Sequence, residues 1–185
     1  MKNYIGIDLG GTSAKGALLD ESGTLHEVYT VATHKEKTPE QTADDIACLA
    51  ETIRTKSAVK NIAGVGVGSP GIVDSKSGKV VLWTTFGWKD VPLSKLRQEK
   101  TGLPIKILSD VNAAVLGEYE YGAAKEYSSA VLLTLGTGVG SGIVIGGKIF
   151  AGNKGAGGEI GHGVIRYNGE KCACGRRGCL ELNRP

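Results

Sequence analysis

The chain has 185 residues, 41% of them hydrophobic and 22% charged, which is the balance of an ordinary globular protein. The net charge of +3 is too small to indicate a nucleic-acid-binding protein, and no apolar run approaches the ~20 residues that span a bilayer. Glycine is the exception, at 29 residues, and its clustering indicates loops in which the backbone makes close approaches.

The first part of the chain predicts three strands, over residues 4–9, 14–19 and 24–33. The first strand carries a single carboxylate, Asp8, which we expect to be buried. Gly10 and Gly11 predict a tight turn between the first two strands, and residues 20–23 predict a hairpin turn between the second and third.

A helix is predicted to begin near Thr38. Thr38 is a good N-cap residue, Pro39 suits the first helical position, and Gln41 completes a capping box. Apolar residues then recur at helical spacing at Ala43, Ile46, Ala47, Ala50 and Ile53. We expect Cys48, in the same helix, to be a small buried hydrophobic residue.

The next predicted elements are a buried strand over 62–67, a short helix over 93–100, a strand over 105–108 and a helix over 111–121. Asp110 stands between the last two, where the site of an α/β protein forms. It is therefore a candidate general base for phosphoryl transfer, although a plain helix N-cap explains an Asp at this place equally well.

The opening pattern then returns. A strand over 131–135, a glycine turn over 136–140 and a strand over 142–145 repeat the first unit, and a shift of 126 residues places Leu9 on Leu135 and Gly16 on Gly142. Two such units predict two domains built on one plan. The boundary is expected within 110–128, and we place it between residues 117 and 118, giving domains 1–117 and 118–185.

Glycine turns between strands expose backbone N–H groups that can bind an anion. The candidate phosphate-binding residues are Gly10, Gly11 and Thr12 in the first turn, with Lys15 beside it, and Gly136, Thr137, Gly138 and Gly140 in the second. One turn alone is better explained as a hairpin. Two such turns, facing each other across a cleft, would grip a polyphosphate from both sides and favour a nucleotide.

A metal site is predicted near the end of the sequence, where one histidine and three cysteines gather: His162, Cys172, Cys174 and Cys179. This set fills the tetrahedral shell of a structural Zn²⁺. A Cys174–Cys179 disulfide or free thiols are the alternatives. The sequence has no secretory signal, so a reducing cytoplasm is expected, where clustered cysteines favour a metal. The site would fix Glu159, His162 and Glu181 in place for a substrate.

These motifs together resemble the ROK family (repressors, open reading frames, sugar kinases), within the actin-like and hexokinase-like group. The resemblance covers the whole chain and rests on seven segments: IGIDLGGTSAKG (5–16), GVGSPGIVD (66–74), GWKDVPL (87–93), SDVNAAVLGE (109–118), LTLGTGVGSG (133–142), GAGGEIGH (155–162) and CACGRRGCLE (172–181). It implies two related α/β domains with a nucleotide and sugar cleft between them, the second domain being incomplete here.

The resemblance implies an ATP-dependent hexose kinase, glucokinase-like, that phosphorylates the 6-hydroxyl. Asp110 would be the catalytic base, the two glycine turns would hold the ATP phosphates, and Asp8 would steer Mg²⁺ through water. The implied sugar-binding residues are Gly71, Ser109, Asp110, Glu159, His162 and Glu181, and the implied zinc ligands are those named above. The expected partners are a sugar and a nucleotide, with neither nucleic acid nor membrane, and a homodimer is possible in this family.

The sequence departs from the family pattern in three ways. Family kinases commonly carry one Asn directly before the catalytic Asp and a second in the loop before the Gly-Trp pair. This chain has Ser109 at the first place and Thr84-Thr85-Phe86 at the second. A shorter hydroxyl thus replaces an amide, which changes the hydrogen bonds expected to the sugar hydroxyls. The chain is also shorter than family members. Two alternatives to an active kinase are therefore kept: a non-catalytic sugar-binding or regulatory protein, and an inactive fragment of a kinase.

Overall fold

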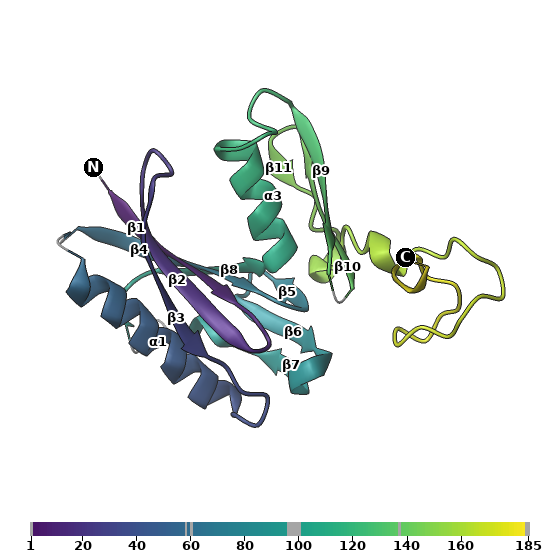
Figure 1. Ribbon diagram of the computed structural model, residues 1–185, viewed down its shortest axis with the longest axis horizontal. Coiled ribbons are helices and arrows are strands. Elements are labelled where there is room, and N and C mark those ends of the chain that lie inside the picture. The colour runs from purple at the N-terminus through teal and green to yellow at the C-terminus, as the bar shows by residue number, and fades with distance from the viewer. Residues whose placement is uncertain (1, 58, 60, 96–100, 137, 184–185) are drawn as a thin grey trace. The chain divides into compact units, whose positions relative to one another are not determined.

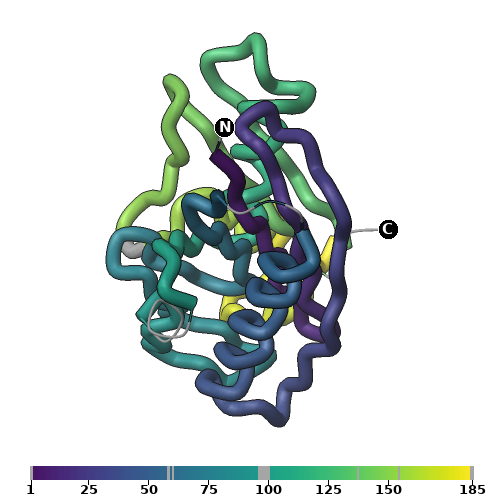
Figure 2. Tube along the Cα trace, turned by 90° about the vertical axis from the view of Figure 1, so that its left-hand side faces the viewer, coloured from purple at the N-terminus to yellow at the C-terminus, as the bar shows by residue number. Residues whose placement is uncertain are grey.

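The computed structural model describes residues 2–57, 59, 61–95, 101–136 and 138–183 (Figures 1 and 2). The chain divides into two compact units, Met1–Asp110 and Val111–Pro185. The boundary expected between residues 117 and 118 falls inside helix α3 (Asp110–Glu120). Within the described residues, no helix combines the length and the apolar character that crossing a membrane requires.

The first unit is built on a five-stranded sheet with the strand order β3-β2-β1-β4-β8. Its strands are β1 (Asn3–Leu9), β2 (Ser13–Asp20), β3 (Leu25–Ala32), β4 (Ile62–Ser69) and β8 (Ile105–Ser109). The first three form an antiparallel meander, whereas β4 and β8 run parallel to β1. All five predicted strands of this unit are confirmed, with ends that differ by one or two residues.

Helix α1 (Pro39–Lys56) packs on this sheet, as both views show (Figures 1 and 2). Its predicted start is confirmed, because the Thr38 side chain accepts a hydrogen bond from the Gln41 N–H and the Gln41 side chain bonds back to Thr38. The buried face is formed by Thr42, Ala43, Ile46, Leu49, Ala50 and Ile53. The burial expected for Cys48 is wrong: its side chain lies off this face and is exposed.

The burial expected for Asp8 is also wrong. Successive side chains of a strand point to opposite faces, and in β1 the odd-numbered residues Ile5, Ile7 and Leu9 fill the core. Asp8 therefore points to the other face, where it is exposed. This exposure leaves the carboxylate accessible to a ligand rather than enclosed in the core.

A three-stranded sheet in the first unit was not predicted. It consists of β5 (Ile72–Asp74), β6 (Lys79–Trp83) and β7 (Trp88–Val91), and the short 3₁₀ helix η1 (Thr84–Phe86) joins the last two strands. Trp83 stacks on Phe86 with ring centroids 3.9 Å apart, and Trp88 meets both rings edge-on. The helix expected over 93–100 lies mostly outside the described residues.

The second unit packs α3 against a small sheet with the order β11-β10-β9. The strands are β9 (Ser129–Leu135), β10 (Val139–Ile145) and β11 (Lys148–Ile149), and three 3₁₀ turns follow: η2 (Asn153–Gly155), η3 (Ile160–His162) and η4 (Leu180–Leu182). The predicted glycine turn over 136–140 is too long, because Val139 and Gly140 already pair with β9. A Cβ on Gly142 would lie 2.5 Å from the Val111 carbonyl oxygen, so glycine lets α3 approach β10 closely.

Candidate functional site

The predicted site residues of the first unit gather at one edge of its sheet. Strands β1, β4 and β8 are parallel neighbours, and their registers place Asp8 beside Gly68 and Ser69 beside Ser109. The carboxyl ends of these strands lead directly into the turn at Gly10, the turn at Gly71 and Asp110. Ligands of open α/β sheets bind outside this edge.

The first glycine turn is tight. The Gly10 N–H donates to the Ser13 carbonyl oxygen over 2.9 Å, and a Cβ on Gly10 would lie 2.8 Å from that oxygen. Gly11 and Thr12, at the tip of the turn, are exposed. The strand register sets Asp8 directly opposite Lys15, so a carboxylate and an ammonium stand on one exposed face beside the turn.

Gly71 has a backbone conformation that only glycine adopts readily, with φ of +85°. A Cβ there would lie 2.2 Å from the Leu82 carbonyl oxygen, so the turn after β4 packs directly on the backbone of β6. Ser109 is 7% exposed, and Asp110, the first residue of α3, is half-buried. Asp110 therefore stands directly after β8, at the carboxyl edge of the five-stranded sheet.

The second glycine turn is closed by a hydrogen bond of 3.0 Å from the Gly136 N–H to the Gly138 carbonyl oxygen. Thr137 lies outside the described residues. Gly138 lies close to the Glu181 side chain, because a Cβ on Gly138 would be 3.3 Å from Glu181 Oε2. Gly140 is part of β10, where a Cβ would lie 2.7 Å from a methyl carbon of Val111.

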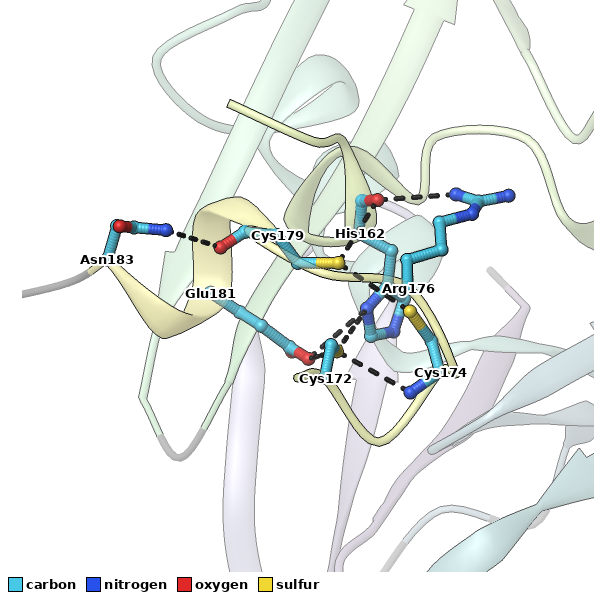
Figure 3. Close-up of polar contacts among 7 residues, drawn as sticks. All are labelled: His162, Cys172, Cys174, Arg176, Cys179, Glu181 and Asn183. Atoms are coloured by element: carbon cyan, nitrogen blue, oxygen red, sulfur yellow. Dashed lines mark hydrogen bonds and ion pairs between the residues drawn. The ribbon is translucent and has the colours of Figure 1, made fainter. Parts of the chain in front are cut away.

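The predicted metal ligands converge at the end of the second unit (Figure 3). The Nδ1 or Nε2 atom of His162 and the sulfur atoms of Cys172, Cys174 and Cys179 all lie within 4.8 Å of one another. Cys174 Sγ is 3.6 Å from Cys179 Sγ, and Cys172 Sγ is 3.6 Å from His162 Nδ1. The two-residue turn between Cys172 and Gly175 brings the thiols together, since the Gly175 N–H donates to the Cys172 carbonyl oxygen over 3.0 Å.

These distances fit a tetrahedral zinc ion better than a disulfide. With Zn–S near 2.3 Å and Zn–N near 2.0–2.1 Å, tetrahedral angles require S···S of about 3.8 Å and S···N of about 3.6 Å. A disulfide would require sulfur atoms about 2.05 Å apart, and all four cysteines are free thiols. The donor set, one imidazole and three thiols, is also the set that structural zinc takes.

Glu181 lies beside this cluster (Figure 3). Its Oε1 atom accepts a hydrogen bond of 2.8 Å from the Cys172 thiol and lies 3.2 Å from His162 Nδ1. This hydrogen bond raises the pKa of Cys172 to about 12, whereas the Arg176 backbone N–H lowers the pKa of Cys174 and burial raises that of Cys179. A bound cation would favour the thiolate at all three positions.

Glu159 and His162, two predicted sugar contacts of this unit, lie in one short turn. Glu159 is exposed and precedes η3, and its carbonyl oxygen accepts a hydrogen bond of 3.2 Å from the His162 N–H. The structure thus brings His162 together with Glu181 through their side chains, and with Glu159 through the backbone of one short turn.

Ser141 anchors this turn, a role that the sequence analysis did not predict. It is 4% exposed, its hydroxyl donates to the Gly158 carbonyl oxygen, and its oxygen accepts a hydrogen bond of 3.1 Å from the Ile160 N–H. Ser141 thereby ties η3, and with it Glu159 and His162, to strand β10. A serine within an apolar strand is the only signal that could have pointed to this role.

The chain is similar to sugar kinases and to a repressor. It is 42% identical to a glucokinase from Thermotoga maritima over 96% of the chain and 55% of that protein, and 35% identical to a xylose repressor from Bacillus spizizenii over 96% of the chain and 46% of the repressor. The fold is similar to a ROK family glucokinase from Streptomyces griseus in complex with glucose and AMPPNP, with a TM-score of 0.86, 34% identity, and coverage of 97% of this chain and 56% of that one.

The chain thus spans about half the length of the relatives it matches. The fold is the actin-like α/β fold of ROK hexokinases and glucokinases, as the sequence predicted. The ROK family pattern matches residues 4–184, which is nearly the whole chain, and the chain therefore belongs to the ROK family.

Proposed function

We propose that this chain carries sugar-binding and phosphoryl-transfer residues of an ATP-dependent hexose kinase of the glucokinase type. The observation that carries the proposal is the gathering of Asp8, the Gly10–Thr12 turn, Gly71, Ser109 and Asp110 at the carboxyl edge of β1, β4 and β8. The similar ROK glucokinase that binds glucose and AMPPNP supports a hexose and ATP as the substrates.

Asp110 is the proposed general base. It takes the proton of the sugar 6-hydroxyl as that oxygen attacks the γ-phosphorus of ATP, and ADP leaves with the bridging oxygen. Its position directly after β8 places it at the carboxyl edge of the sheet, where ligands of open α/β sheets bind. Ser109, buried directly before Asp110, offers a single short hydroxyl as the proposed contact to the sugar.

The exposed N–H groups of the first glycine turn and the ammonium of Lys15 are the proposed phosphate ligands of the first unit. Asp8, exposed and opposite Lys15, is suited to hold a Mg²⁺ ion through water, and this ion would neutralise the charge of the phosphates. In the second unit, Gly136, Thr137, Gly138 and Gly140 are proposed to contact phosphate.

His162, Cys172, Cys174 and Cys179 are the proposed ligands of one structural zinc ion, which supplies folding energy and no chemistry. The bound metal would fix the turn that carries Glu159 and the position of Glu181. These two carboxylates, with the free ring nitrogen of His162, are the proposed contacts to sugar hydroxyls in this unit.

ATP consumption by the purified chain, with Mg²⁺ and a panel of hexoses, tests the proposal. Asp110→Asn should lower turnover by about 10²–10⁴-fold, because it removes a general base. The same change at Asp44, exposed on α1, should leave turnover unaltered. Turnover that survives in Asp110→Asn would refute the assigned role.

A regulatory sugar-binding protein is the second candidate, and the similarity to a xylose repressor favours it. Calorimetric titration with the same sugars separates the two. A sugar that binds without being phosphorylated supports the regulator, whereas a sugar that is turned over supports the kinase. A chain that binds no sugar and consumes no ATP contradicts both functions.

A further inference from the structure

Thr33 holds the first glycine turn from behind. It follows β3 directly and is 3% exposed. Its hydroxyl donates a hydrogen bond of 2.8 Å to the Gly10 carbonyl oxygen, and its backbone N–H donates one of 3.0 Å to the Thr12 carbonyl oxygen. We call these two hydrogen bonds the Thr33 clamp. The motifs of the sequence end at Gly16 and resume after β3, so they do not include this residue.

The Thr33 clamp fixes the direction of the N–H groups in the turn. A trans peptide is planar, and its C=O and N–H groups point in opposite directions. The described residues contain no cis peptide bond. Because the Gly10 carbonyl points at Thr33, the Gly11 N–H must point away from it. The Gly11 N–H therefore points away from Thr33, towards the tip of the turn, where Gly11 and Thr12 are exposed.

The carbonyl oxygens are the groups that would repel a phosphate. Turned outward, the Gly10 carbonyl would present a partial negative charge at the tip of the turn. The clamp keeps this oxygen satisfied inside the protein, where an unpaired polar group is unfavourable. It thus makes the turn a donor surface and keeps the main acceptor away from it.

We propose that Thr33 is a positioning residue for phosphate binding, which orients the Gly10–Gly11 peptide so that its N–H faces the bound polyphosphate; this rests on the kinase function proposed above. Threonine suits the role because branching at Cβ restricts its hydroxyl to few rotamers. The residue touches the turn and not the ligand, so its loss should weaken phosphate binding without altering the affinity for the sugar.

Three variants of the 185-residue chain test this inference. Thr33→Val removes the hydroxyl at nearly constant shape and keeps the backbone N–H. Thr33→Ser restores the hydroxyl. Thr30→Val makes the same chemical change at an exposed position of β3, three residues before Thr33, and serves as the matched control. Each is titrated with AMPPNP and with inorganic tripolyphosphate in the presence of Mg²⁺, and with glucose.

Loss of one hydrogen bond should weaken binding of both phosphate probes by about two- to tenfold in Thr33→Val. Thr33→Ser should recover most of this loss, and Thr30→Val should bind like the wild type. Glucose affinity should be the same in all four proteins. Equal phosphate affinity in Thr33→Val and wild type, or an equal loss of glucose affinity, would overturn the inference.

The NMR chemical shift of the Gly10 carbonyl carbon separates a failure of this inference from a failure of the proposed function. Without any ligand, the carbonyl carbon resonance of Gly10 should move in Thr33→Val towards that of a carbonyl without a hydrogen-bond donor, and return in Thr33→Ser. If wild type binds neither phosphate probe but this resonance behaves as expected, the kinase function and the phosphate role fail while the clamp stands. An unmoved resonance refutes the clamp itself, whatever the chain binds.

Discussion

Gly71 offers the sharpest test of how the sheet edge is built, because two separate effects oppose any side chain there. With φ of +85°, an alanine would sit in the left-handed region, which is unfavourable by about 1–2 kcal/mol. Its Cβ would also lie 2.2 Å from the Leu82 carbonyl oxygen, and since that atom belongs to the backbone, β6 must shift. Overpacking of this kind costs about 1–3 kcal/mol, so Gly71→Ala should destabilise the first unit by about 2–5 kcal/mol.

Two neighbouring glycines separate these effects. Gly87 has φ of +65° and nothing within 4 Å of its Cβ position, so Gly87→Ala should show backbone strain alone, about 1–2 kcal/mol. Gly66, in β4, has neither positive φ nor a close neighbour, and Gly66→Ala should be stabilising by up to about 1 kcal/mol.

Urea unfolding followed by tryptophan fluorescence is the suitable assay. The chain has two tryptophans, Trp83 and Trp88, and both lie in the first unit with the three glycines, so the signal reports that unit. The expected order of midpoints is Gly66→Ala above wild type, then Gly87→Ala, then Gly71→Ala. A Gly71→Ala midpoint equal to or above that of Gly87→Ala would refute the packing of this turn on β6.

Three further predictions follow from the described contacts. The purified chain should hold one zinc per molecule, which Cys179→Ser should release and Cys48→Ser should retain; metal analysis and the visible absorption of the cobalt-substituted chain measure this, and equal retention in both would contradict the assigned ligands. Thr38→Ala should destabilise α1 by about 1 kcal/mol in urea unfolding, because it removes the hydroxyl oxygen that accepts a hydrogen bond from the Gln41 N–H, and an unchanged midpoint would contradict this. The Ser22 hydroxyl bonds to Asp20 and lowers the pKa of its carboxyl below 3.8, so Asp20 contributes stability above pH 3.8 that is lost as pH falls through its folded-state pKa. The difference in unfolding midpoint between wild type and Asp20→Ala should therefore be full at pH 5 and shrink in acid, and a difference that grows in acid would reverse the sign of this argument.

Local chemistry was the most predictable part of the molecule. The capping box at Thr38 and Gln41 was predicted from three residues within four positions, Thr38, Pro39 and Gln41, because the geometry of a helix start is set within a few residues. The convergence of the three cysteines was likewise predicted from spacing, since they lie within eight positions, and His162 was predicted as the fourth ligand that completes a zinc shell. The roles of His162 in sugar binding and of the glycine turns in phosphate binding stay predictions.

Burial was less predictable, because it depends on what packs against each face of a strand or helix. Asp8 was expected in the core, but the strand alternation sets Ile7 and Leu9 inward and Asp8 outward. The sheet of β5, β6 and β7 was missed because its strands are short and irregular: each has three to five residues, and a register shift interrupts the pairing of β5 with β6. Strands of this length have too few side chains to establish a period of two.

Two leucines that match in the sequence repeat lie in different environments in the structure. Leu9 and Leu135 match under the shift of 126 residues, yet Leu9 is fully buried and Leu135 is 80% exposed. Leu9 lies opposite Ala14, whereas Leu135 lies opposite Val139, so the second turn is one residue shorter. Because side chains alternate along a strand, a slip of one residue moves a matched side chain to the opposite face.

The matched glycines behave differently from the leucines. A Cβ on Gly16 would lie 2.8 Å from Ile53 of α1, and a Cβ on Gly142 would lie 2.5 Å from the Val111 carbonyl of α3, so each glycine permits a helix to approach its sheet. The second strand of each hairpin thus meets a helix at the matched glycine, through side-chain atoms at Gly16 and through a backbone oxygen at Gly142, and the first strand takes the register that the turn allows. A glycine repeated at a helix contact is therefore better evidence for two related units than a repeated leucine, because both glycines lie at a close helix contact whereas the two leucines lie on opposite faces of their strands.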